Sequence, residues 1–208
     1  MILTLMRRVY LRSIRQLGMK KLSWDKQFET AVSCYGPRSE NTIARVQDLC
    51  RGGRLLEFGC GEGDLPFALS EGAFSSYAGF DISEVAIGRA RQKTTTSGRG
   101  NIRFERCDIE SWEGNDIASL IVAEECLYYL STIEVERFLL RCAHCLSSEG
   151  SILVIVHSSS KHATTLDVCR RVCRVRDEES VGGRVFVTLA AKPLNDLHTQ
   201  RPTPASSL

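Results

Sequence analysis

The chain has 208 residues, a length that suits one α/β domain with a single hydrophobic core and leaves little room for a second full domain. Hydrophobic residues make up 43% and charged residues 25%, which is typical of a globular protein and excludes a disordered or collagen-like chain. The net charge of +2 is too balanced to favour a nucleic-acid partner. No apolar run reaches the roughly 18 residues that an integral membrane segment needs.

The first 24 residues carry six Lys or Arg side chains and no acid. A secretory signal would place its positive charges before an apolar stretch, whereas here they follow six mostly apolar residues. We therefore expect no export and a cytoplasmic location. The pattern favours an amphipathic packing helix over a helix that lies on a membrane surface, which is the alternative. Residues 1–38 are accordingly predicted to form an N-terminal helical lid region.

Hydrophobic periodicity between residues 39 and 157 predicts helices and strands in alternation. The predicted helices cover 39–50, 64–71, 83–93 and 133–146, and the predicted strands cover 54–58, 77–81, 102–107, 117–123 and 151–156. The polar stretch 94–100 is predicted to be a loop. Strands that alternate with helices form a parallel sheet through right-handed crossovers. The predicted fold class is therefore α/β, a single doubly wound, Rossmann-like domain over residues 39–191.

The pattern is weaker after residue 157. Residues 165–175 fit a helix, or a helix whose second half is a strand, and Gly182-Gly183 marks a turn. Residues 184–191 are rich in β-branched and aromatic side chains, which predicts a strand, and we expect this last strand to run antiparallel to the others. Residues 192–208 contain three of the five prolines and are predicted to be a flexible tail.

The chain has nine cysteines, which in the absence of an export signal indicate reduced, buried thiols. Cys142 and Cys145 have the spacing of metal ligands. However, Cys142 shares an apolar stripe with Val135, Phe138 and Leu139, in the rhythm of a helix face that packs against a core. We therefore expect no metal site.

The most informative stretch is Leu-Leu-Glu-Phe-Gly-Cys-Gly-Glu-Gly-Asp at 55–64, where a predicted strand runs into a glycine loop that opens a helix. Glycines let a ligand lie against bare backbone, and ligands bind at the carboxyl ends of strands in doubly wound sheets. A dinucleotide site would need glycine at position 64, where this chain has Asp64. Together with Glu57 and Glu62, this acid would repel a pyrophosphate and suit a ligand that carries an amino group and a sulfonium. Asp81 ends the next strand about 20 residues on, where a carboxylate can accept both ribose hydroxyls.

The pattern Glu-x-Gly-x-Gly-x-Gly at 57–63, followed by Asp81 and by Cys107-Asp108-Ile109 at strand ends, resembles class I S-adenosylmethionine-dependent methyltransferases. The resemblance implies S-adenosyl-L-methionine as the cofactor, with Asp81 on the ribose and Ile82 along the adenine. Asp108 is implied to bind the adenine amino group, with Ile109 on the other face of the ring. The residues implied to hold the methionine moiety are Glu57, Phe58, Gly59, Cys60, Gly61 and Gly63. Asp81 and Asp108 could instead cap a helix or a turn.

The fourth predicted strand ends in the segment Val-Ala-Glu-Glu-Cys-Leu-Tyr-Tyr-Leu at 122–130. It lacks the prolines of DNA and adenine-amino methyltransferases, and its glutamates are adjacent rather than separated as in protein arginine methyltransferases. It looks most like the nodulation protein S type of N-methyltransferase, with one extra residue between Glu124 and Leu127. Those relatives methylate the free amino group of a deacetylated chitin-like oligosaccharide. The resemblance therefore implies a small-molecule amine acceptor, with an amino sugar as one candidate.

A methyl group on a sulfonium is already activated, so the protein mainly has to position the acceptor and exclude water. An amine must be neutral to attack, and a carboxylate at the end of the fourth strand can steer the ammonium in and take its proton. We predict this catalytic role for Glu124 or Glu125, with Glu124 also next to the cofactor. Tyr128 or Tyr129 is predicted to line the pocket, and Tyr128 is the catalytic candidate of the two. One residue of each adjacent pair is expected to face the site. His157 could serve as the base for a hydroxyl acceptor or be an ordinary loop histidine.

Trp24 and Phe28 are expected to pack over the cofactor as part of the lid. Two alternatives to amine methylation stay open at this point. One is O-methylation of a hydroxyl or carboxylate. The other is a cofactor-binding subunit without catalysis, which the short region after His157 favours somewhat. The sequence predicts a small-molecule acceptor and no nucleic-acid partner, and it leaves the oligomeric state open.

Overall fold

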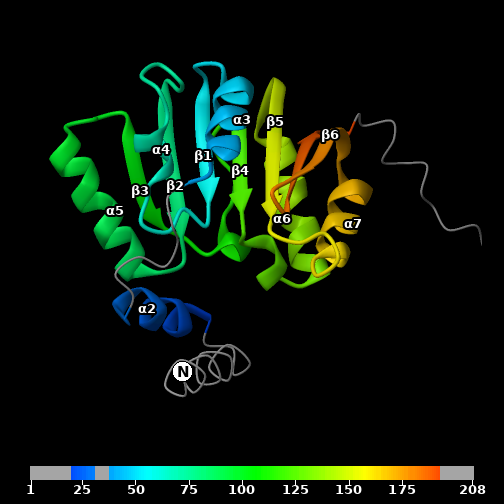
Figure 1. Ribbon diagram of the computed structural model, residues 1–208, viewed down its shortest axis with the longest axis horizontal. Helices are drawn as coiled ribbons and strands as arrows, with labels where there is room; N and C mark the ends of the chain where they lie inside the picture. The colour runs from blue at the N-terminus through cyan, green and yellow to red at the C-terminus, as the bar shows by residue number, and fades with distance from the viewer. Residues whose placement is uncertain (1–19, 31–37, 193–208) are drawn as a thin grey trace, which may run out of the picture.

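The computed structural model describes residues 20–30 and 38–192, and the structural statements below refer to this part of the chain. The predictions for the tail and for most of the N-terminal region fall on residues 193–208, 1–19 and 31–37, which lie outside the described residues. Within the described part, seven strands form one sheet in the order β3-β2-β1-β4-β5-β7-β6 (Figure 1). The strands are β1 (Arg54–Phe58), β2 (Ser76–Asp81), β3 (Ile102–Arg106), β4 (Ala118–Glu124), β5 (Leu146–Val156), β6 (Arg174–Val181) and β7 (Arg184–Ala190).

Neighbouring strands from β3 to β5 pair in parallel, whereas β7 runs antiparallel to β5 and β6 runs antiparallel to β7. This arrangement confirms the predicted α/β, Rossmann-like fold with a mostly parallel sheet and an antiparallel last strand. Strands β1 and β4 lie side by side at the centre, where the chain order reverses direction across the sheet. Ligands of open α/β sheets bind at such a switch point, outside the carboxyl ends of the strands.

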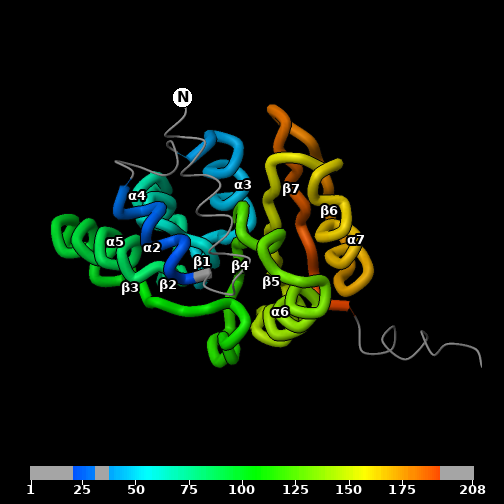
Figure 2. The backbone as a smooth tube through the Cα atoms, turned by 90° about the horizontal axis from the view of Figure 1, so that it is seen from below, coloured from blue at the N-terminus to red at the C-terminus, as the bar shows by residue number. Residues whose placement is uncertain are grey.

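Helices cover both faces of the sheet, and Figure 2 shows α3 and α6 on opposite sides of it. The α-helices are α2 (Lys20–Thr30), α3 (Glu40–Cys50), α4 (Leu65–Ala68), α5 (Glu84–Ser97), α6 (Thr132–His144) and α7 (Ala163–Val172), and the short 3-10 helices are η1 (Ile109–Ser111) and η2 (Leu127–Tyr129). Side chains of α3, α4 and α5 join one buried apolar cluster, and those of α6 and α7 join the other. Strand β4 is buried on both faces between the two clusters, as its continuous apolar run predicts.

The starts of the helices follow the local cap signals. Ser39 and Ser83 accept hydrogen bonds from the backbone of the first turns of α3 and α5, and Ser131 forms a capping box with Glu134 at α6. The predicted loop at 94–100 is wrong for its first half, because α5 continues to Ser97. Threonines in this last turn donate their hydroxyls to carbonyls one turn earlier, and Gly98 ends the helix in the left-handed conformation.

Helix α4 is much shorter than the predicted span 64–71. The side chain of Asp64 makes no cap hydrogen bond and instead pairs with Lys93 of α5. The chain becomes extended at Leu69, and the Ser70 backbone N–H donates to the side chain of Gln47, 2.8 Å away. A tertiary contact with α3 therefore replaces the next intrahelical hydrogen bond.

Strand β6 has no counterpart among the predicted strands. Its sequence, Arg-Val-Arg-Asp-Glu-Glu-Ser-Val, is mostly charged, and nearly every residue in it is exposed. An edge strand that is open on both faces needs no apolar alternation, and its charges protect the edge against pairing with other chains. The turn at Gly182-Gly183, where both residues have positive φ, joins it to β7 as expected.

Helix α2 lies near the carboxyl ends of β2 and β3, below them in Figure 1, and it contacts α5. The described part of the predicted lid thus sits where ligands of this fold bind. No helix among residues 20–30 and 38–192 is long and apolar enough to cross a membrane.

Candidate active site

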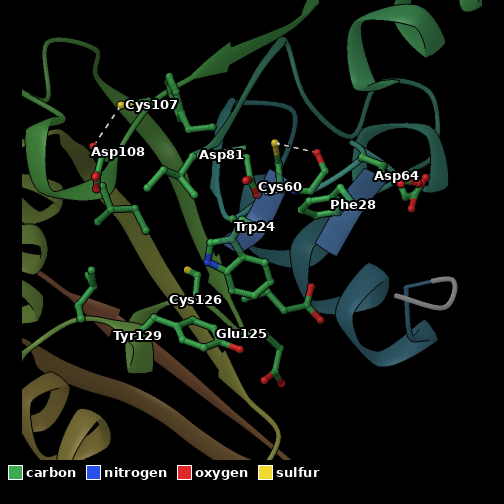
Figure 3. A pocket seen from close by; sticks show the side chains of 18 of the residues that line it. Trp24, Phe28, Cys60, Asp64, Asp81, Cys107, Asp108, Glu125, Cys126 and Tyr129 are labelled. Carbon is green, nitrogen blue, oxygen red and sulfur yellow. Dashed lines mark hydrogen bonds between the residues drawn. The ribbon is translucent and has the colours of Figure 1, made fainter. Parts of the chain in front are cut away.

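A cavity of about 290 Å³ opens at the carboxyl ends of β1 to β4, beneath α2 (Figure 3). This volume lies at the lower end of the range for small-molecule pockets. The wall combines the glycine loop after β1, the acids that end β2 and β3, the segment after β4 and two aromatic rings of α2. The lining residues are Trp24, Phe28, Arg38, Gly59, Cys60, Gly61, Glu62, Asp64, Phe80, Asp81, Ile82, Cys107, Asp108, Ile109, Glu124, Glu125, Cys126, Tyr129, Leu130 and Arg184.

The glycine loop owes its shape to positive backbone φ angles and to hydrogen bonds with β2. Gly59, Gly61 and Gly63 have φ of 72°, 56° and 74°, values that residues with a Cβ rarely adopt. The backbone N–H groups of Gly59 and Cys60 both donate to the carbonyl of Phe80 at 2.8 and 3.1 Å. The loop is therefore fastened to the neighbouring strand and presents bare backbone at Gly61 to the cavity.

Asp81 joins the end of β2 to this loop. Its Oδ2 accepts a hydrogen bond from the Gly61 N–H at 3.0 Å, and its Oδ1 accepts one from the Ser83 N–H at 2.9 Å. Burial raises the pKa of this carboxyl, while the two backbone donors act in the opposite direction. Each carboxylate oxygen can accept a further hydrogen bond, so Asp81 can bind hydroxyl donors in the cavity and hold the loop at the same time.

Glu57 lies beneath the cavity rather than in its wall. It is fully buried, and it accepts hydrogen bonds from the Tyr77 hydroxyl and from Nη2 of Arg38, each at 2.5 Å. Burial raises the pKa of Glu57, and the Arg38 charge and the Tyr77 hydroxyl oppose that rise. The glutamate of the motif thus holds Arg38, whose guanidinium does line the cavity.

Glu124 and Glu125 both line the cavity, although only one of the two was expected to face it. The expectation of one per pair is wrong for the glutamates because Glu125 has φ of 55°, which breaks the strand alternation directly after β4. Glu124 accepts hydrogen bonds from both Arg38 and Arg184. Oε2 of Glu125 accepts the Tyr128 hydroxyl at 2.8 Å and lies 2.7 Å from Nδ1 of His157, while Oε1 is buried without a partner among the described residues.

Of the two tyrosines, only one lines the first cavity, as expected, and the other lines a second cavity. Tyr129 lines the cavity, and its ring contacts Trp24 edge-on at 5.1 Å. Tyr128 faces a second cavity of about 190 Å³, where its ring stacks on His162 at 3.9 Å. Tyr128, which we predicted as catalytic, is therefore outside the lining of the first cavity. It contacts two lining residues, Glu125 through its hydroxyl and Tyr129 through its ring, whose centroid is 4.6 Å away.

The residues predicted at the adenine end lie together in the wall. Ile82, Cys107, Asp108 and Ile109 all line the cavity. Oδ1 of Asp108 also accepts the Glu110 N–H at 3.0 Å. Asp108 therefore caps η1, which is the capping role considered above as the alternative to adenine binding. Of the other predicted cofactor residues, Phe58 and Gly63 are outside the lining set, since Phe58 packs in the core and Gly63 packs against Phe104.

Helix α2 is held over the cavity by contacts on two sides. Oδ1 of Asp25 accepts the Ser83 hydroxyl at 2.6 Å and the Val85 N–H at 3.4 Å, which ties α2 to the start of α5. On the other side, Trp24 meets Tyr129 of the segment after β4. Trp24 and Phe28 form part of the cavity wall, as the sequence predicts for the lid. These aromatic rings would shield a bound ligand from water.

Arg38 and Arg184 are the site residues that sequence reasoning missed. No motif surrounds either residue, and they reach Glu124 from 86 and 60 positions away along the chain. The thiols in the wall belong to Cys60, Cys107 and Cys126, and burial raises the pKa of each. Within the part of the chain that the structure describes, no three His, Cys, Asp or Glu side chains are grouped to hold a metal ion.

Comparisons with known proteins show similarity to methyltransferases over the central part of the chain. Residues 55–150 match the family described as a methyltransferase domain. The protein YqeM of Bacillus subtilis (strain 168) is 33% identical over 117 residues, which are 53% of this chain and 45% of YqeM. The chain therefore spans less than half the length of this curated relative.

Solved structures show the same fold at low identity. The N-methyltransferase NodS from Bradyrhizobium japonicum WM9, in complex with S-adenosyl-L-homocysteine, aligns with a TM-score of 0.68 and 16% identity over 83% of this chain and 98% of NodS. The O-methyltransferase NcsB1 from neocarzinostatin biosynthesis aligns with a TM-score of 0.61 and 18% identity over 73% of this chain and 53% of NcsB1. These likenesses show that the chain has the same fold as these two methyltransferases.

Proposed function

We propose that this chain transfers the methyl group of S-adenosylmethionine to a small-molecule amine, with an amino sugar of an oligosaccharide as a specific candidate. The observation that carries the proposal is the cavity at the sheet switch point. It has a bare glycine loop and acids at three strand ends, and one buried glutamate oxygen at the end of β4 has no partner among the described residues. The amine assignment draws further support from the segment at 122–130, which resembles the nodulation protein S type.

The residues of the cavity fit the functional groups of S-adenosylmethionine. We assign the ribose hydroxyls to Asp81, whose oxygens retain acceptor capacity beside the glycine loop. We assign the cofactor carboxylate to Arg38, because a guanidinium binds carboxylates by paired hydrogen bonds. Asp108 and Ile109 take the adenine end of the cavity. The described part of the lid, which contributes Trp24, then excludes water from the reacting atoms.

When bound, S-adenosylmethionine supplies an activated methyl group. The residues after β4 would hold the acceptor nitrogen in line with that methyl group, so that an N–C bond could form as the C–S bond breaks and its electron pair stays on sulfur. The acceptor loses one proton in this reaction, and one of the two glutamates at the end of β4 receives it. The products are the methylated amine and S-adenosylhomocysteine.

A second candidate is O-methylation, which the pair of Glu125 and His157 favours because a hydroxyl acceptor needs a stronger base than an amine does. A third is cofactor binding without catalysis. We also propose a cytoplasmic location, since the eight described cysteines are all free thiols, as is usual in a reducing compartment.

The test is to incubate the purified chain with methyl-labelled S-adenosylmethionine and a metabolite extract, and to search for products heavier by one methyl group. Amines, including D-glucosamine and chitosan oligosaccharides, form one panel and phenols form another. We expect label on nitrogen. Label on oxygen would favour the second candidate, and cofactor binding without any product would favour the third. The Asp81→Ala variant is the matched control for product that depends on the cofactor site.

A further inference from the structure

We propose that Glu125, and not its neighbour Glu124, receives the proton of the acceptor, and that His157 and Tyr128 are positioning residues that hold the Glu125 carboxylate for this task. The inference rests on the proposed function and deepens it. It assigns separate roles to two adjacent acids that look equivalent in the sequence.

Glu124 forms ion pairs with two arginines. Its Oε2 accepts from Nη1 of Arg38 and its Oε1 accepts from Nη1 of Arg184, and the side chain is almost fully buried. Both oxygens already take part in charge-assisted hydrogen bonds, so neither is free to receive a proton from an acceptor. Its role is to fix Arg38, which also pairs with Glu57 beneath the cavity, and to join the tip of β7 to the site through Arg184.

Glu125 is held in a conformation that favours a functional role. Its φ of 55° is unfavourable for a residue with a Cβ, and such residues persist only where the surroundings fix them. Here the Glu125 N–H donates to the carbonyl of Ile155 on β5 at 2.9 Å. The left-handed turn brings the Glu125 side chain into the cavity wall with Cys126 and Tyr129, as Figure 3 shows.

The two oxygens of Glu125 have different surroundings. Oε2 is held by the Tyr128 hydroxyl at 2.8 Å and by Nδ1 of His157 at 2.7 Å. Oε1 is buried and has no hydrogen-bond partner within the described residues. A buried carboxylate oxygen without a donor is costly, and an N–H or O–H group of a bound acceptor would remove that cost. The carboxylate is thus fixed on one side and open to a donor on the other.

The groups around Glu125 are suited to a proton acceptor. Burial raises the pKa of Tyr128, so its hydroxyl stays protonated and can only donate to Glu125. His162 stacks on Tyr128 and has Nε2 at 3.4 Å from Nε2 of His157. Burial and the neighbouring His157 lower the pKa of His162, which keeps that ring neutral near pH 7. Lys161 lies next to His162 in the wall of the second cavity.

The proton balance is simple. The protonated acceptor amine first gives one proton to Oε1 of Glu125, which becomes a neutral carboxylic acid. The neutral nitrogen then forms the N–C bond as the C–S bond breaks, and the electron pair of that bond stays on sulfur. His157, which bonds Oε2 through Nδ1, keeps the carboxyl group oriented during the transfer. Glu125 returns the proton to water when the product leaves.

The experiment compares Glu125→Gln with Glu124→Gln on the amine that the labelled-methyl screen identifies, with D-glucosamine tried first. Methyl transfer is followed in single turnovers at saturating cofactor, and S-adenosylhomocysteine affinity is measured by calorimetry. We expect Glu125→Gln to slow transfer by about 10²–10⁴-fold, the usual contribution of a general base, and to bind S-adenosylhomocysteine as the wild type does. Glu124→Gln should change cofactor affinity more than the rate of transfer.

Two further readouts separate proton transfer from a structural effect. The deficit of Glu125→Gln should shrink as the pH rises above the pKa of the acceptor amine, because the amine then arrives neutral. His157→Gln and Tyr128→Phe should lower kcat more than they raise KM. Equal rates of methyl transfer for Glu125→Gln and wild type would overturn the inference and leave the proposed function intact. A larger loss of transfer rate in Glu124→Gln than in Glu125→Gln would do the same. A wild-type chain that binds no S-adenosylmethionine would overturn both.

Discussion

Gly63 belongs to the glycine loop but does not line the cavity, so a substitution there tests the packing of the loop. An added Cβ at Gly63 would lie 2.4 Å from Cζ of Phe104 and 2.8 Å from Cβ of Ala90. Both neighbours are buried, so neither can move aside easily. The φ of 74° adds a backbone penalty for any residue other than glycine. The Gly63→Ala variant should therefore destabilise the fold through two independent effects.

The loss of unfolding free energy in Gly63→Ala can be estimated from these two effects. A left-handed backbone costs a residue with a Cβ roughly 1–2 kcal/mol, and overpacking of a tight core costs roughly 1–3 kcal/mol. We expect Gly63→Ala to lower the free energy of unfolding by about 2–5 kcal/mol, the sum of the two terms.

Gly61→Ala is the matched control. Its φ is also positive, at 56°, but the nearest atom to an added Cβ is Cζ of Phe28, at an ordinary contact distance of 3.7 Å. This variant should therefore lose only the backbone term of roughly 1–2 kcal/mol. Urea denaturation with a shared m-value measures both losses. Equal destabilisation of the two variants would refute the packing argument for Gly63.

Three other predictions concern the site. Asp81→Ala should weaken S-adenosylhomocysteine binding by about 1–3 kcal/mol through lost charge-assisted hydrogen bonds, and unchanged affinity in calorimetry would remove the ribose assignment. Arg38→Ala should destabilise the fold by about 3–5 kcal/mol, because it leaves buried Glu57 without its cation. Adding Glu57→Gln should restore part of that loss in urea denaturation, and no recovery would count against the buried pair. The thiol of Cys60 should resist alkylation by iodoacetamide at pH 7, because burial raises its pKa and suppresses the thiolate. Mass spectrometry of the treated chain measures this, and rapid alkylation of Cys60 would contradict its burial.

The central strands and the glycine loop can be predicted from sequence because local signals determine them. Strand β1 has the predicted bounds, since the segment with Leu55, Leu56 and Phe58 stops at the first of three glycines. The serine caps of α3 and α5 mark the helix starts, and the buried run of β4 marks the sheet centre. The acids at the ends of β2 and β3 meet in one cavity because parallel strands share a carboxyl edge.

The remaining features depend on contacts that local patterns do not encode. Strand β6 is held by pairing with β7 and carries no apolar signal of its own. The partners of Glu124 come from distant parts of the chain, so its ion pairs are invisible in the sequence. The left-handed conformation of Glu125 places both glutamates in the wall, against the alternation expected of adjacent residues.

The ligand of the cavity decides whether this chain is a methyltransferase. The decisive measurement is isothermal titration of the wild-type chain with S-adenosylhomocysteine and, separately, with NADH. We predict saturable binding of S-adenosylhomocysteine that Asp81→Ala weakens, and no binding of NADH. Tight NADH binding with no heat from S-adenosylhomocysteine would contradict the account.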